Sequence, residues 1–169
     1  MAIISTGQKN EVKLPIMADI KIGKTGGIIV NEYMQTSVED IFACGSNIET
    51  TDFVCQSKRI FEDIANIIKS AKIAADNVVG IKTKKSKQIR NDLIKVFDYE
   101  IAITGANENE LNCKNIKFNR LYLSCLDSET FGGKPQRLFM KLLFADDGQI
   151  LGMQMLGKKG VFALENPLS

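Results

Sequence analysis

Apolar residues recur every three or four positions between residues 58 and 79, and this spacing is the strongest periodic signal in the chain. It predicts one long amphipathic helix over about residues 58–79, because an α-helix brings every third or fourth side chain to the same face. Gly80 stands where such a helix is expected to end. The apolar positions of the stripe are Ile60, Phe61, Ile64, Ile67, Ile68, Ala71, Ala74, Ala75 and Val78.

Short apolar runs precede this helix, and two of them end at a glycine. Residues 3–7 are typical of a short buried strand, residues 28–32 of a β-branched strand, and residues 41–44 of a third apolar segment ahead of Gly45. Polar and irregular stretches separate the three runs, so we expect loops between short strands in this part of the chain.

The pattern changes to strands beyond residue 93. Residues 107–111 are expected to begin a short helix, and Asp146, Asp147 and Gly148 form a hairpin-turn signal. These features predict a small antiparallel sheet. Its expected strands cover residues 94–104, 120–126, 137–144 and 149–156.

A basic stretch lies between the helix and these strands. Without interleaved aromatic residues, such a run most often forms a solvated linker; the alternative is that it attracts a phosphate-bearing ligand. We therefore expect three parts: residues 1–80, a linker over 81–92, and residues 93–169. The fold class is α+β, with short strands and one long helix followed by an antiparallel sheet. The basic residues are Lys82, Lys84, Lys85, Lys87 and Arg90.

Composition excludes several classes of function. The 169 residues are 44% hydrophobic and 25% charged, which is ordinary for a globular protein. The net charge of +2 predicts no nucleic-acid partner, and no apolar run reaches the roughly 18 residues that a membrane span needs. We expect a cytoplasmic protein. Because the chain has no histidine, no catalytic triad with an imidazole base and no histidine-ligated metal site can form within it.

The four cysteines form no CxxC pair, so neither a zinc site nor a thioredoxin-type motif is expected. We expect free, mostly buried thiols in a reducing compartment. Cys44 precedes Gly45 at the end of an apolar run, and we interpret it as a small buried apolar residue rather than a redox centre.

Five segments, in order, resemble the C-terminal part of the FAD-dependent pyridine nucleotide-disulfide oxidoreductases. Residues 26–46, which end in Ile-Phe-Ala-Cys-Gly-Ser, are similar to the family's second flavin motif. The ending Ala-Ala-Asp-Asn-Val-Val-Gly is similar to the end of the family's long helix, and the strands resemble its dimerisation domain. The subgroup that the chain resembles most is that of coenzyme A disulfide reductases and NADH oxidases. The five segments are residues 4–10, 26–46, 74–80, 95–105 and 142–157.

The resemblance implies a partial, weak FAD site at Gly45, Ser46 and Asn47. In the family an aspartate follows the glycine and accepts a hydrogen bond from a ribityl hydroxyl, whereas this chain has Ser46. The GxGxxG fingerprint that cradles the FAD pyrophosphate is absent, as are the family's redox-active cysteine and its NAD(P)H-binding domain. We therefore expect no catalytic residue, no metal site, and no disulfide reductase activity from this chain alone.

The dimerisation domain implies a homodimer. The apolar rows over residues 94–103 and 138–144 are candidates for the dimer interface, and the alternative is that they form ordinary sheet core. A second interpretation is a stand-alone, non-catalytic scaffold or partner-binding module derived from the family. A third is a subunit that completes a separate flavoprotein chain, because half of a FAD domain would leave one helix face uncovered.

Overall fold

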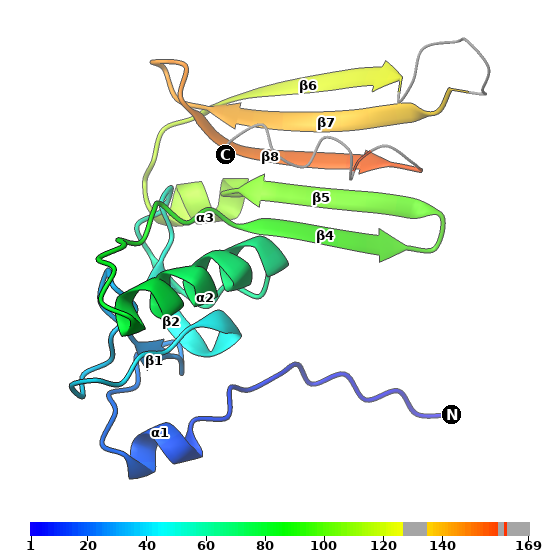
Figure 1. The fold of residues 1–169 in the computed structure, drawn as a ribbon. Coiled ribbons are helices and arrows are strands. Elements are labelled where there is room, and N and C mark those ends of the chain that lie inside the picture. The colour runs from blue at the N-terminus through cyan, green and yellow to red at the C-terminus, as the bar shows by residue number, and fades with distance from the viewer. Residues whose placement is uncertain (127–134, 159–160, 162–169) are drawn as a thin grey trace. The chain divides into compact units, whose positions relative to one another are not determined.

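The structure is a computed structural model that describes residues 1–126, 135–158 and 161. It divides into two units (Figure 1). The first unit comprises Met1–Asp52 and Ser57–Gln88. The second comprises Phe53–Gln56 and the chain from Ile89 onward.

The first unit combines short strands with one long helix. Its three-stranded sheet has the order β1-β2-β3, with β1 and β2 parallel and β2 and β3 antiparallel. Ile28, Met34 and Ile48 form its core together with Ile73 and Ala74 of the long helix. The elements are α1 (Lys13–Met17), β1 (Ile28–Ile29), a 3-10 turn (Gly45–Asn47), β2 (Ile48–Thr51), β3 (Lys58–Arg59) and α2 (Ile64–Val78).

Helix α2 ends where the apolar stripe predicts, but it begins six residues later. Lys58 and Arg59 instead pair with β2, and this pairing requires an extended backbone. Asp63 then caps the helix, because its carboxylate accepts a hydrogen bond from the Asn66 backbone N–H at 2.9 Å. The expected start at residue 58 was therefore wrong.

Two further expectations for this unit were wrong. Residues 3–7 form no strand, and Ile3 and Ile4 are exposed, because no neighbouring strand among the described residues pairs with them. Residues 41–44 form only an isolated bridge, between Gln35 and Phe42. The predicted strand over residues 28–32 is confirmed at its first two positions.

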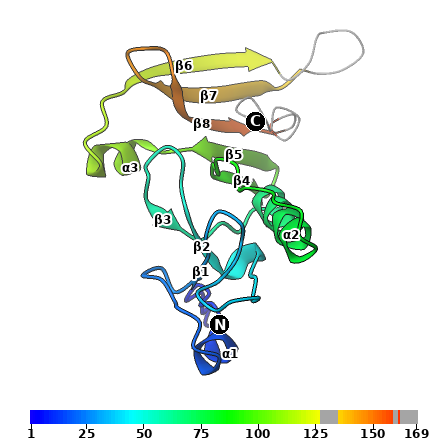
Figure 2. The same cartoon turned by 60° about the vertical axis from the view of Figure 1, so that its left-hand side comes forward.

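The second unit is built around a five-stranded antiparallel sheet with the order β4-β5-β8-β7-β6 (Figures 1 and 2). One short helix, α3, connects β5 to β6. The expected fold class, α+β with a small antiparallel sheet, is confirmed. The elements are β4 (Asn91–Val96), β5 (Tyr99–Gly105), α3 (Glu108–Cys113), β6 (Asn119–Leu126), β7 (Arg137–Phe144) and β8 (Ile150–Gly157).

The strand expected over residues 94–104 is in fact a hairpin. Val96 pairs with Tyr99, so Phe97 and Asp98 form a two-residue turn between β4 and β5. Phe97 has a φ of 54° there, a backbone conformation that non-glycine residues seldom adopt. Nothing in the local sequence signals a turn at an aromatic residue, and the apolar residues on both sides therefore suggested one continuous strand.

The sheet closes tightly where β5 meets β8. A Cβ atom on Gly152 would lie 1.9 Å from the carbonyl oxygen of Ala106. Only glycine permits this approach, which lets the Ala106 N–H donate to the carbonyl oxygen of Leu151 at 2.9 Å. Leu111 and Leu143 pack nearby with Leu151 and Ala106 in one core cluster.

Candidate functional site

The glycine–serine turn, Gly45–Asn47, is the candidate binding site. Gly45 has a φ of +85°, a left-handed conformation that glycine adopts without steric cost. A Cβ atom built on Gly45 would have no neighbour within 4 Å, so the space beside its backbone is open. The Gly45 N–H donates to the hydroxyl of buried Ser70 at 3.0 Å, and that contact fixes the turn against helix α2.

The segment before α1 holds the turn from a second side. The Asn10 side-chain amide donates to the backbone carbonyl of Ser46 at 3.0 Å, and the Asn47 side-chain amide donates to that of Glu11 at 3.2 Å. Contacts 36 residues apart in the sequence therefore position the three expected site residues together.

The turn presents neutral polar groups. Ser46 is exposed, and its hydroxyl has no hydrogen-bond partner among the residues that the structure describes. A serine hydroxyl can both donate and accept a hydrogen bond, and the carbonyl oxygen of an asparagine side chain such as Asn47 can accept one. Such a set suits the hydroxyl groups of a polyol, and the glycine allows close approach.

Glu49 of strand β2 holds a different, glycine-rich turn, at residues 23–27, and the sequence analysis did not identify it. Its buried carboxylate accepts hydrogen bonds from the Thr25 backbone N–H at 2.9 Å and from the Thr25 hydroxyl at 2.8 Å. A Cβ atom on Gly23 would lie 2.1 Å from the same carboxylate, so a larger residue there would displace the Glu49 side chain. A buried acid next to a glycine-rich turn is the signal that points to this role.

The prediction that the cysteines are mostly buried was wrong. Cys44, Cys113 and Cys125 are exposed, and Cys55 alone among the four is buried. Cys44 is extended, with φ −147° and ψ 175°, immediately before the turn. Its side chain is therefore not the small buried apolar residue that the run 41–44 suggested.

Ion pairs engage part of the basic stretch. Lys84 lies 2.8 Å from the carboxylate of Glu32 and 5.5 Å from the ring centre of Tyr33. Its hydrogen bond to Glu32 is the main reason why the pKa of Lys84 is raised. Burial lowers the pKa of Lys85, and the nearby charge of Lys58 lowers it further.

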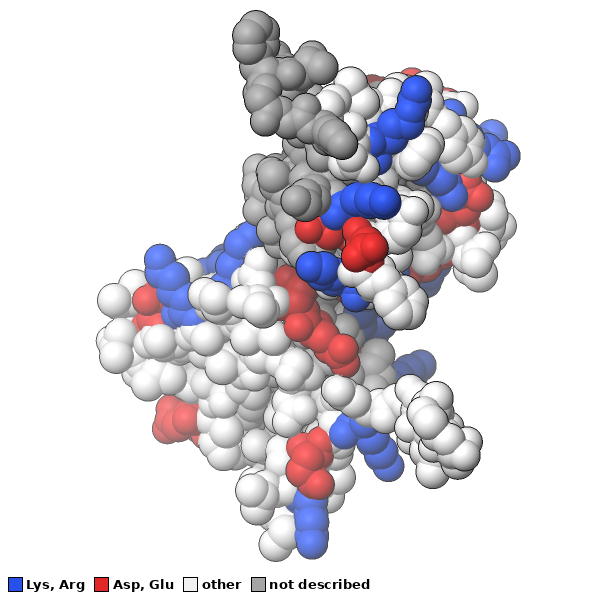
Figure 3. All heavy atoms as spheres, turned by 90° about the vertical axis from the view of Figure 1, so that its right-hand side faces the viewer, with Lys and Arg blue, Asp and Glu red and all other residues white. Residues whose placement is uncertain are grey.

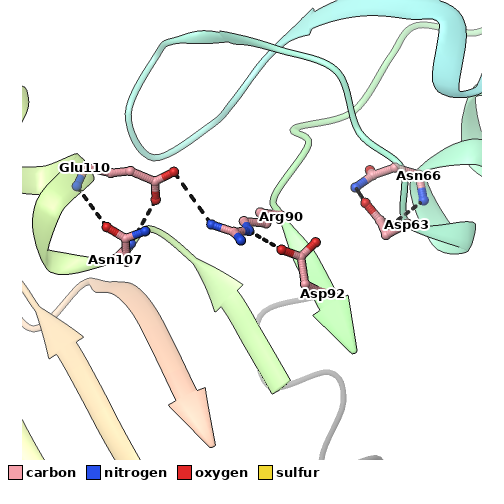
Figure 4. Close-up of polar contacts among 6 residues, drawn as sticks. All are labelled: Asp63, Asn66, Arg90, Asp92, Asn107 and Glu110. Carbon is pink, nitrogen blue, oxygen red and sulfur yellow. Dashed lines mark hydrogen bonds and ion pairs between the residues drawn. The ribbon is translucent and has the colours of Figure 1, made fainter. Parts of the chain in front are cut away.

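Arg90, the last basic residue of the stretch, belongs to a polar network of the second unit (Figure 4). Its guanidinium pairs with Asp92 and lies 3.7 Å from a carboxylate oxygen of Glu110. Glu110 and Asn107 form a reciprocal capping box at the start of α3, with both hydrogen bonds at 2.9 Å. Arg90 therefore connects the start of β4 to this helix rather than pointing toward an open site.

Charges of both signs are interspersed on the face drawn in Figure 3, with uncharged surface between them. Among the residues that the structure describes, no helix has the length and apolar character needed to cross a bilayer.

The fold indicates the class of protein. Short strands and one long helix, followed by a five-stranded antiparallel sheet, also occur in solved oxidoreductase structures, among them a NAD-dependent persulfide reductase.

Comparison of the sequence with family models identifies the family itself. Residues 1–77 match the pyridine nucleotide-disulphide oxidoreductases, and residues 93–164 match the dimerisation domain of the same family. The chain belongs to the pyridine nucleotide-disulphide oxidoreductase family, whose members depend on FAD and NAD(P)H. The family resemblance inferred from the sequence is thus confirmed.

Curated relatives are similar along nearly the whole chain. An NADH oxidase of Methanocaldococcus jannaschii is 30% identical over 161 residues, which are 95% of this chain and 36% of that protein. An NAD(P)H sulfur oxidoreductase (CoA-dependent) of Pyrococcus furiosus is 29% identical over 93% of this chain and 36% of its own length. The chain therefore spans about a third of these relatives.

Solved structures agree with the sequence comparison. A NAD-dependent persulfide reductase from A. fulgidus superposes with a TM-score of 0.89 and 30% identity, over 97% of this chain and 31% of that one. Reduced Bacillus anthracis CoADR-RHD gives a TM-score of 0.88 and 29% identity, over 95% and 29% of the two chains.

Proposed function

We propose that this chain provides the C-terminal segment of a FAD-binding domain and the dimerisation domain of a flavin-dependent NAD(P)H disulfide oxidoreductase, and that it is not catalytic alone. In this proposal residues 1–80 belong to the FAD domain, 81–92 connect the parts, and 93–169 mediate dimerisation. The observation that carries the proposal is the open glycine–serine turn, because the sequence that leads into it resembles the family's second flavin motif.

The residues of the turn fit a flavin in part. Open space beside Gly45 would admit the ligand, and Ser46 and Asn47 would form hydrogen bonds to its hydroxyl groups. FAD, when bound, supplies the electron transfer, and the protein positions it. Ser46 replaces the family's carboxylate with a neutral group. Charge-assisted hydrogen bonds contribute about 1.5–3 kcal/mol and neutral ones about 0.5–1.5 kcal/mol, so FAD should bind weakly.

A fluorescence titration of FAD tests this proposal. The substitution Ser46→Asp restores the carboxylate and should tighten FAD binding about tenfold, since each 1.4 kcal/mol is one decade in affinity. Quenching of flavin fluorescence and a shifted flavin absorption band report the binding.

Ser86→Asp is the matched control, because Ser86 is also exposed and belongs to the same unit. It adds the same charge away from the turn and should leave the affinity for FAD unchanged. If neither the wild-type chain nor Ser46→Asp binds FAD at millimolar protein, the turn is not a flavin site.

The only support for NAD(P)H comes from the family. The relatives named above have NADH or NAD(P)H in their names, and about two thirds of the length of each lies outside the region that matches this chain. The proposed role of this chain in such an assembly is to complete the FAD site and to hold two copies together as a homodimer.

A second candidate function is that of a module that binds a separate flavoprotein chain. Ile64, Ile68 and Val78 lie along one side of α2, and each is more than 60% exposed. An apolar helix face of this kind is covered in most folded proteins. Size-exclusion chromatography of the chain, mixed with the N-terminal two thirds of a relative, tests it: co-elution with bound FAD supports this function.

A further inference from the structure

A cavity of about 280 Å³ lies in the first unit, at the C-terminal end of helix α2. Two aromatic rings, two side-chain amides, a glycine and a lysine line it. Pockets that hold drug-sized ligands measure about 300–1,000 Å³, so this one fits a smaller molecule with a single ring. The lining residues are Tyr33, Gln35, Phe42, Asn77, Gly80 and Lys82.

A tight turn builds the aromatic side of the cavity. The side-chain oxygen of Asn31 accepts hydrogen bonds from the backbone N–H groups of Tyr33 at 2.9 Å and Gln35 at 3.1 Å. Met34, between them, is fully buried in the core of the unit, and Gln35 forms a bridge with Phe42. The backbone on this side is therefore fixed before a ligand arrives, which lowers the entropic cost of binding.

Asn77 fixes the helical side of the cavity. Its side-chain amide donates to the carbonyl oxygens of Ile73 at 2.8 Å and Thr83 at 2.7 Å, and its side-chain oxygen accepts from the Thr83 N–H at 3.3 Å. These contacts tie the segment with Gly80 and Lys82 to the end of α2. A Cβ atom built on Gly80 would have no neighbour within 4 Å, so the space beside this backbone is open.

Lys82 brings an uncompensated positive charge to the cavity. It is exposed, and its ammonium group has no hydrogen-bond or ion-pair partner among the residues that the structure describes. Glu32 adjoins Tyr33 in the sequence, but its carboxylate lies 2.8 Å from the ammonium group of Lys84. Glu32 is therefore neutralised by another lysine and does not compensate Lys82.

The end of α2 leaves Lys82 unpaired as well. Asp76, which adjoins Asn77, accepts a hydrogen bond from the Thr83 hydroxyl at 3.0 Å. The carbonyl oxygens of residues 75–77, at the negative end of the helix dipole, accept hydrogen bonds from the backbone N–H groups of residues 79–81. An anionic ligand can therefore reach Lys82 without displacing a contact within the protein.

This cavity is separate from the glycine–serine turn. That turn contacts Ser70 in the middle of α2, and Asn77 lies about 10 Å further along the helix, at a rise of about 1.5 Å per residue. An inference about the cavity is therefore independent of the proposed function, and the absence of FAD binding would not affect it.

We propose that this cavity binds a small aromatic acid, with its ring against Tyr33 and Phe42 and its carboxylate on Lys82. Aromatic rings favour offset-stacked and edge-to-face contacts with one another. A hydrogen bond from an ammonium group to a carboxylate is roughly twice as strong as one between neutral groups. Gln35, whose side-chain amide has no partner among the described residues, offers a second donor to the ligand.

The probe is 4-hydroxybenzoate, and 4-hydroxybenzamide is its neutral analogue of nearly the same shape. Proton–nitrogen correlation NMR spectra of the whole chain at pH 7 measure both affinities. The acid should bind with a Kd of about 1 mM, as expected for so small a ligand, and shift the signals of Gly80 and Gln35. The amide should bind about tenfold more weakly. Acetate, which has no ring, should shift neither signal.

The decisive variant is Lys82→Gln. It should weaken binding of the acid about tenfold and leave that of the amide unchanged, so that the preference for the acid disappears. Lys72→Gln is the matched control, because Lys72 is an exposed lysine of α2 that does not line the cavity. It should keep the preference. Both lysines are exposed, so neither substitution should disturb the fold.

Tyr33→Leu tests the aromatic side. It should weaken binding of both probes by the same factor, roughly threefold to tenfold, with thermal unfolding as the check on folding. If this variant does not fold, the comparison of Lys82→Gln with Lys72→Gln still decides. The proposal would be overturned by equal affinities of the wild type for acid and amide, by a preference that survives Lys82→Gln, or by signals of the lining residues that do not shift.

Discussion

Lys84 and Lys85 are neighbours in the sequence, but their surroundings shift their pKa values in opposite directions. Lys84 is exposed beside Glu32, which raises its pKa. Lys85 is partly buried, and desolvation together with the charge of Lys58 lowers its pKa. The same residue type therefore stabilises the fold at one position and destabilises it at the next.

The substitution Lys85→Met should raise the free energy of unfolding at pH 7, because it removes a charge that is costly to bury. Since the folded-state pKa of Lys85 is lowered, the unfolded chain binds more protons between that pKa and 10.5. The wild type gains stability as the pH rises through this window, so the advantage of Lys85→Met should shrink. Urea unfolding of both chains at pH 7 and pH 10 measures the change.

Lys84→Met is the control and should show the opposite behaviour. With a raised folded-state pKa, Lys84 stabilises the chain fully below pH 10.5, and that contribution is lost only as the pH rises through the folded value. This variant should be slightly less stable than the wild type by a constant amount between pH 7 and pH 9. A constant difference for Lys85→Met between pH 7 and pH 10 would contradict the burial of its charge.

At the scale of elements, the ends of helices are set by side chains that contact backbone groups. The Asn107 side chain accepts a hydrogen bond from the Glu110 N–H at the start of α3. The Glu110 carboxylate accepts one from the Asn107 N–H and also pairs with Arg90. The short helix α3, of six residues, depends on this cap because it has few internal hydrogen bonds.

The substitution Asn107→Ala should lower the free energy of unfolding by about 1 kcal/mol, the usual cost of a lost N-cap. Asn109→Ala is the matched control, because Asn109 is an exposed residue inside the same helix. Its effect should stay within about 0.5 kcal/mol. Denaturant unfolding followed by circular dichroism compares the two, and equal losses would show that the cap is not what holds α3.

Periodic patterns predicted the elements where one face of the element is buried. The C-terminal end of α2 and the strands β7 and β8 follow the apolar spacing closely, because packing against a core selects that spacing. Features that depend on a distant partner were not predictable. The pairing of Lys58 and Arg59 with β2, and the turn at Phe97, are of this kind.

The candidate site, too, was predictable only in part. The motif around Gly45 was found from the sequence, because its residues resemble a flavin motif. The contacts that hold the turn come from Asn10, Glu11 and Ser70, between 25 and 36 residues away, and no local pattern signals them. The exposure of Cys44 was mispredicted because the apolar run before it suggested a buried strand.

At the scale of the whole molecule, the chain spans about a third of its relatives. Flavin-dependent transfer from NAD(P)H requires a complete cofactor site, so the chain alone should not oxidise NADH in the presence of FAD and coenzyme A disulfide. Absorbance at 340 nm measures this, with the Methanocaldococcus jannaschii NADH oxidase as a positive control for NADH oxidation. A steady rate that depends on the chain and on FAD would contradict the proposal that it is not catalytic alone.

The short segment Phe53–Gln56 belongs to the second unit, although the chain on both sides of it belongs to the first. Its Val54 and Cys55 pack with Leu111 and Leu143 in a core cluster. A truncated protein that starts at residue 89 would therefore lack part of its hydrophobic core, and side chains that are buried in the whole chain would be exposed to solvent. The shortest piece that keeps this interior intact has to begin before residue 53, so an excised sheet cannot stand in for the domain in binding studies.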